Sequence, residues 1–169
     1  MNDAEFEGAV RQHSDRVHRH AIWVLQDREE ARDVAQEALV SLWKHRTEVV
    51  EPAARSWLLR TTYRLCLDRL RRRRALAEVG GESTVPVLPD PAPGPERAAA
   101  SARLGDHLER ALSTLPARDR AVVLLREVEG LPYDEIARVL DLPLGTLKAL
   151  LHRSRERLRV ALVREGVRP

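Results

Sequence analysis

The stretch LPYDEIARVLDLPLGTLKALLHRSRERLR, residues 131–159, contains two helical apolar patterns separated by a short break. Apolar residues recur at three-to-four spacing over residues 136–140 and again, mainly as leucines, over residues 147–158. Pro143 separates the two patterns, because proline cannot continue a preceding helix but suits the first turn of the next one. Two short helices with this break predict a helix-turn-helix.

The second of these helices would present a face of small and cationic side chains opposite its leucines, and such a face can enter a major groove. A solvated helix pair in an ordinary bundle would give the same leucine spacing. A basic helix lying on a membrane is disfavoured, because it would need bulky aromatics and none follows Tyr133. The candidate DNA-reading residues on this face are Thr146, Lys148, Ala149, Leu150, His152 and Arg153.

The composition predicts an all-α chain. Its 169 residues are 43% hydrophobic and 33% charged, which leaves room for one medium domain or two small ones. Ala, Leu, Glu and Arg recur at helical spacing, whereas strand-forming runs are sparse. No apolar run of about 18 residues and no leader pattern occurs, so we expect a cytoplasmic protein with no membrane insertion.

The residues of metal sites and common catalytic motifs are missing. Cys66 is the only cysteine, so neither an internal disulfide nor a cysteine-based zinc cluster can form. His13, His18 and His20 share one predicted helix but lack the spacing of a metal-binding motif. Walker, Rossmann and nucleophile-elbow motifs are absent as well. We therefore expect no catalytic residue, no metal and no cofactor.

The charge is distributed in blocks along the chain, although the net charge is only +3. Residues 1–40 carry five Arg or Lys against nine Asp or Glu, whereas residues 41–74 carry ten against three. A second basic block, residues 142–169, carries seven against two. A charge that served solubility alone would be spread evenly, so two separate basic blocks indicate a polyanion held at two places.

The second predicted helix, residues 28–45, carries a small acidic face. Asp27 and Glu30 have the spacing of a capping-box variant at its start. Asp33 and Glu37 lie four residues apart and so share a face, with Gln36 beside them. Two interpretations stay open here: a solvated face, or a docking surface for a basic partner.

The third predicted helix begins near Pro52 and ends in an arginine run at Arg74. Arginines interleaved with aromatic rings suit an unpaired nucleic-acid strand, because guanidinium groups bind phosphates while rings stack on bases. An arginine run at a helix end can also remain solvated and favour the helix dipole. The candidate strand-binding residues are Trp57, Arg60, Tyr63, Arg64, Arg69, Arg71 and Arg72.

These patterns predict two small helical domains, residues 1–75 and 96–169. Between them, residues 76–95 contain five prolines from Pro86 to Pro95 and no amphipathic period, which indicates a flexible linker. Such a linker is long enough to hold two DNA-reading domains apart on a separate scaffold. The second domain begins with two more amphipathic helices, the second ending at Gly130, a natural C-cap.

Residues 115–158, LPARDRAVVLLREVEGLPYDEIARVLDLPLGTLKALLHRSRERL, resemble the fourth conserved region of extracytoplasmic-function sigma factors, which are initiation subunits of bacterial RNA polymerase. REEARDVAQEALVSLWKHR (residues 28–46) and SWLLRTTYRLCLDRLRRRR (residues 56–74) resemble their second conserved region. The two regions come in the family's order. The chain departs from the family at Ala149-Leu150, where serine and arginine are frequent, and at Arg64, where asparagine is.

The resemblance implies that Asp33, Gln36 and Glu37 face the clamp helices of the polymerase largest subunit. It also implies that residues 57–74, with the loop before them, engage the minus-10 promoter element, and that residues 143–159 read the minus-35 element. The partners would be core RNA polymerase and promoter DNA, and an anti-sigma factor is left open as a third. Two alternatives remain: a helix-turn-helix regulator that acts without core polymerase, and a helical adaptor with no nucleic-acid role.

Overall fold

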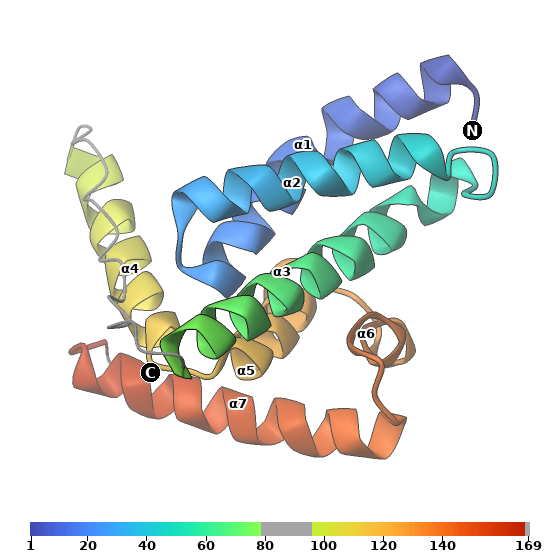
Figure 1. The fold of residues 1–169 in the computed structure, drawn as a ribbon. Coiled ribbons are helices and arrows are strands. Elements are labelled where there is room, and N and C mark those ends of the chain that lie inside the picture. Colours follow the sequence, from blue (N-terminus) through green and yellow to red (C-terminus); the bar gives the residue numbers. More distant parts are fainter. Residues whose placement is uncertain (79–95, 168–169) are drawn as a thin grey trace.

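A computed structural model describes residues 1–78 and 96–167, which we call the N-terminal and C-terminal halves (Figure 1). The described residues are helical and contain no strand, which confirms the predicted all-α class. The helices are α1 (Asp3–Leu25), α2 (Arg28–Lys44), α3 (Ala54–Glu78), α4 (Glu96–Ser113), α5 (Ala117–Val123), α6 (Tyr133–Leu140) and α7 (Leu144–Arg164), with a 3-10 turn at Glu51–Ala53 and a π-helical turn at Leu124–Val128.

Local sequence signals account for several helix ends. The side chain of Asp27 accepts a hydrogen bond from the Glu30 backbone N–H at 2.9 Å, as the capping pattern predicted. Asp141 ends α6 in the left-handed region, with φ at 55°, and Gly130 has φ at 65° directly after the π-helical turn. These positive φ angles let the chain reverse between α5, α6 and α7 within a few residues.

The N-terminal half is a three-helix unit in which α1, α2 and α3 all contact one another. In Figure 1, α1 and α2 lie side by side and α3 crosses beneath them. Part of its core, at the end near the α2–α3 connection, contains the fully buried Leu42, Ala54 and Leu58.

The C-terminal half holds the predicted helix-turn-helix. α6 and α7 contact each other, and α7 also packs against α4 and α5. Leu147 and Leu151 of α7 are buried together with Ile136 of α6, so the apolar seam predicted from leucine spacing joins these helices. The helix before Gly130, expected as one continuous segment, instead changes to π-helical geometry at Leu124.

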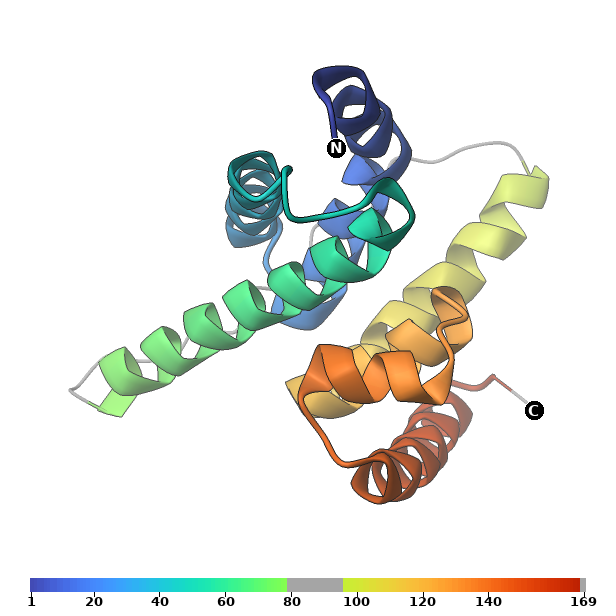
Figure 2. The same cartoon turned by 90° about the vertical axis from the view of Figure 1, so that its right-hand side faces the viewer.

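The two halves pack directly against each other, with α1 against α5 and α3 against α6 (Figures 1 and 2). One apolar cluster runs through both halves: it joins Val24 and Leu59 to Val122 and Leu125. In the free chain the two halves are therefore in contact, and their separation on a separate scaffold stays a prediction. The linker prediction itself falls mostly on residues 79–95, which lie outside the described residues. None of the described helices is both long and apolar enough to cross a bilayer.

Candidate polymerase and promoter interfaces

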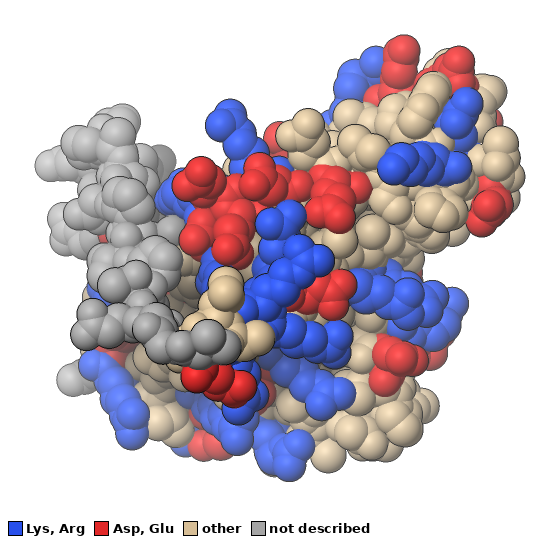
Figure 3. Space-filling model, in the orientation of Figure 1, with Lys and Arg blue, Asp and Glu red and all other residues tan. Residues whose placement is uncertain are grey.

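The acidic face predicted on α2 is present on the surface. Asp33, Gln36 and Glu37 are all exposed, because the opposite side of α2 is buried through Val34 and Ala38. Figure 3 shows acidic side chains gathered over α2, directly above a band of basic side chains over α3. The face is thus accessible to a partner without any change in the structure.

Glu37 is not free of interactions, since its carboxylate pairs with Arg69 of α3 at 3.3 Å. Both side chains are partly exposed, so water screens the pair and it contributes little to stability. In the free protein, Glu37, a candidate polymerase contact, is therefore paired with Arg69, a candidate DNA contact.

The basic residues of α3 divide into an exposed set and a structural one. Arg60, Arg64 and Arg72 are exposed, and Arg71 is exposed while bonded to Asp68 at 3.3 Å. One structural member is Arg73, which donates to Glu30 at 2.6 Å and to the backbone oxygen of Leu25 at 3.2 Å, and lies 3.3 Å from Asp27. Arg73 thus ties α3 to the α1–α2 turn.

The two aromatic candidates on α3 have different surroundings. Trp57 is half-buried: it packs against the N-terminal core cluster, with its ring centroid 5.7 Å from that of His45. Tyr63, named above as a candidate strand-binding residue, is instead buried: it is 2% exposed and belongs to the apolar cluster shared by both halves. Burial raises the pKa of its phenol, and in this arrangement its ring cannot stack on a base.

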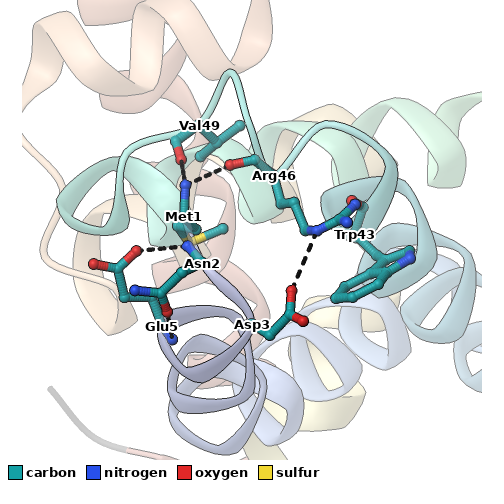
Figure 4. Close-up of polar contacts among 7 residues, drawn as sticks. All are labelled: Met1, Asn2, Asp3, Glu5, Trp43, Arg46 and Val49. Atoms are coloured by element: carbon teal, nitrogen blue, oxygen red, sulfur yellow. Dashed lines mark hydrogen bonds and ion pairs between the residues drawn. The ribbon is translucent and has the colours of Figure 1, made fainter.

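The connection before α3 is held by the start of the chain (Figure 4). The amino nitrogen of Met1 donates to the backbone oxygens of Arg46 at 2.5 Å and Val49 at 3.3 Å. Arg46 also stacks over the Trp43 ring at 3.8 Å and lies 3.7 Å from the Asp3 carboxylate. These contacts fix the loop expected to accompany α3 at the minus-10 element.

The DNA-reading face predicted on α7 is exposed at five of its six positions: Thr146, Lys148, Ala149, His152 and Arg153. The prediction for Leu150 is wrong, because its side chain is only 7% exposed and packs in the core. Leu150 therefore belongs to the buried seam with Leu147 and Leu151, and it offers no methyl contact to a groove.

A buried carboxylate that the sequence pattern did not reveal anchors α7. Asp119 of α5 accepts hydrogen bonds from Ser154 Oγ at 3.0 Å and from the Arg157 guanidinium at 2.5 Å. The Asp119 side chain is 6% exposed and its bond with Ser154 is buried, whereas the Arg157 side chain is 54% exposed. Ser154 lies seven residues after Leu147 and so falls on the same buried side of α7. A polar residue at such a position is the sequence signal that could have indicated a buried polar partner.

Within the described residues, no group of three or more His, Cys, Asp or Glu side chains could hold a metal ion. Cys66 is buried and free, and burial raises the pKa of its thiol to about 12. Its environment is that of a small core residue.

Comparison with known proteins decides the family. The family models for sigma-70 region 2 and sigma-70 region 4 match residues 9–76 and 106–158. The chain is 36% identical over 157 residues to the ECF RNA polymerase sigma factor SigE of Mycolicibacterium smegmatis, covering 93% of this chain and 61% of SigE. It is 30% identical over 165 residues to SigW of Bacillus subtilis, covering 93% of this chain and 88% of SigW. This chain belongs to the extracytoplasmic-function (ECF) sigma factors.

Solved structures agree with the ECF sigma fold. The sigma factor RpoE of Bartonella quintana, solved with the anti-sigma factor NepR, matches with a TM-score of 0.78 at 22% identity, over 93% of this chain and 96% of that one. CnrH, solved with the cytosolic domain of CnrY, matches with a TM-score of 0.65 at 22% identity, over 95% of this chain and 89% of that one. Sigma factors are non-catalytic transcription initiation factors.

Proposed function

We propose that this ECF sigma factor joins core RNA polymerase through the acidic face of α2, engages the minus-10 element with α3 and reads the minus-35 element with α7. One observation carries the proposal: a single chain presents an exposed acidic face on α2 and exposed cationic side chains on both α3 and α7. A regulator that acts alone would need only the basic faces. The family models support domains at residues 1–75 and 96–169, with 76–95 as linker.

At the minus-35 element, Lys148 and Arg153 can address guanine or phosphate, while Thr146 and His152 add shorter polar contacts. Ala149 lies between them and donates no side-chain hydrogen bond. These four exposed side chains of α7 would therefore make the polar contacts to the minus-35 DNA. Catalysis is left to core polymerase, and the chain works in the cytoplasm, where bacterial polymerase acts.

An anti-sigma factor is the third partner that we propose. Support comes from the RpoE structure, in which a sigma factor of the same fold is bound to the anti-sigma factor NepR.

Transcription with purified core polymerase and a promoter library tests the proposal. We expect initiation that depends on this chain and on the promoter sequence. Sequence-selective DNA binding without core polymerase, and no initiation with it, would favour a stand-alone regulator. A chain that neither bound DNA nor supported initiation would be a helical adaptor.

A further inference from the structure

Two arginines of α7 lie on opposite sides of its buried seam. At about 100° per residue, Arg155 lies about 80° from the buried Leu147 in one direction and Arg157 about 80° in the other. The two guanidinium groups therefore mark the two edges of the seam, where it meets the exposed face proposed to read DNA. Each of them bonds to a carboxylate from outside α7.

Glu127 of the π-helical turn holds the first edge. Its Oε1 accepts hydrogen bonds from Arg155 Nε at 2.8 Å and from Arg155 Nη2 at 2.6 Å. Both side chains are partly exposed, so water screens the pair and it contributes little to stability. Two donors from one planar guanidinium do constrain direction, because they fix the plane of the group against its acceptor.

Asp119 of α5 holds the second edge. Its Oδ1 accepts hydrogen bonds from Arg157 at 2.5 Å and from Ser154 Oγ at 3.0 Å. α5 and the π-helical turn adjoin each other in the chain, and α7 runs beneath α5 in Figure 1. We call the pairs Glu127–Arg155 and Asp119–Arg157 the α7 clamp, because they join α7 to one helical segment on both sides of its seam.

The rotation of α7 about its own axis decides which side chains face a groove. Lys148 lies about 20° around the helix from Arg155. Thr146 lies about 20° from Arg157 on the other side, so the proposed reading face begins beside each clamped arginine.

A small rotation is enough to disturb a base contact. An α-helix with its side chains has a radius of about 5–6 Å, so a rotation of about 20° moves the reading side chains by about 2 Å. Donor–acceptor distances in good hydrogen bonds vary by only about 0.5 Å. Burial of the leucine seam is non-directional, so the seam by itself fixes this rotation less sharply than directed polar bonds do.

We propose that the α7 clamp sets the rotation of α7 and thereby selects which minus-35 sequence this sigma factor prefers. Its four residues are positioning residues: they act through Thr146, Lys148 and the other reading side chains. The two carboxylates also withdraw two arginines of the C-terminal basic block from DNA phosphates. The selection of sequence rests on the proposed role of α7, whereas the clamp consists of contacts within the free chain.

A minus-35 promoter library transcribed by holoenzyme, assembled from core polymerase and the whole chain, tests the selection. We expect Glu127→Arg, which repels Arg155, to change the preference between bases by about fivefold or more at one or more positions, since one base contact is worth at least that much. The double variant Glu127→Arg with Arg155→Glu should return toward the wild-type preference, because it restores opposite charges. Asp134→Asn is the matched control, since it breaks an exposed pair with Arg138 inside α6 alone.

Preference is a ratio between sequences, so a loss of folded protein or a uniform change in phosphate attraction cancels from it. A Glu127→Arg variant with the wild-type preference, or a double variant that keeps the altered one, would overturn the selection.

Thermal unfolding tests the clamp without DNA. We expect the double variant to melt at a higher temperature than Glu127→Arg or Arg155→Glu alone, and a double variant no more stable than either would overturn the pairing. If the pairing is present but wild-type holoenzyme shows no minus-35 preference, the proposed function of α7 fails, and the selection of sequence fails with it while the clamp stands.

Discussion

His20 gives this protein a stability that depends on pH. The residue lies on α1 with 2% of its surface exposed, and burial lowers the pKa of its imidazole from 6.5 to about 4. His20 in the unfolded chain therefore becomes protonated below about pH 6.5, whereas His20 in the folded protein stays neutral until about pH 4. Stability that is present above pH 6.5 is lost as the pH falls toward 4, and the loss from this residue is about 3 kcal/mol.

Urea unfolding at pH 7 and pH 4 measures this loss. Carboxylates titrate over the same range, so the informative quantity is the difference between wild type and His20→Leu, which fills the site without titrating. We expect His20→Leu to lose about 3 kcal/mol less than wild type between the two pH values. His152→Gln, which removes an exposed histidine of α7, should lose as much as wild type. Equal losses in wild type and His20→Leu would refute the reasoning.

Three further predictions concern the interfaces. Reversing both charges with Asp33→Arg and Glu37→Arg should weaken core binding by about 2–5 kcal/mol in a titration, whereas Asp15→Arg, an exposed reversal on α1, should not. Leu150→Ala should lower the free energy of unfolding by about 2–5 kcal/mol because Leu150 is buried. The control Ala149→Ser, at the neighbouring exposed position, should change the free energy of unfolding by about 0.5 kcal/mol or less. Equal stability of the two variants would contradict the core position of Leu150. If Arg153 contacts guanine, Arg153→Ala should remove about 1–3 kcal/mol of discrimination between bases at one minus-35 position. If Arg153 contacts phosphate, the variant should bind all minus-35 sequences more weakly by the same factor. No change across a minus-35 library would exclude both roles.

Most of the secondary structure and the exposed parts of the site could be predicted because they depend on residues close together in sequence. Asp27 caps α2 through a bond to Glu30, three residues away. The exposure of Asp33 and Glu37 follows from the four-residue spacing that places them opposite the buried side of α2. Whether they contact polymerase stays a prediction, since nothing in the free protein tests it.

Leu150 and Tyr63 show where periodicity fails. Leu150 lies about 60° around the helix from Leu147, at the edge of the seam, where the breadth of the neighbouring helix decides burial. Tyr63 lies on α3 among arginines, and the cluster that covers it includes residues of the other half. A sequence pattern gives the angle of a side chain on its helix but does not say which element will pack there.

The sequence by itself determined the all-helical class, the helix-turn-helix, the acidic face of α2 and the family, because helix spacing, capping residues and dense motifs are local. Only the tertiary structure decided that the halves share a core. The bond from Arg120 to Val24 joins residues 96 positions apart, and that from Arg55 to Glu129 joins residues 74 apart. No local signal marks such partners, because an arginine that caps a distant helix looks in sequence like any solvated cation. Their pairing depends on the three-dimensional packing of α1 and α3 against α5 and α6.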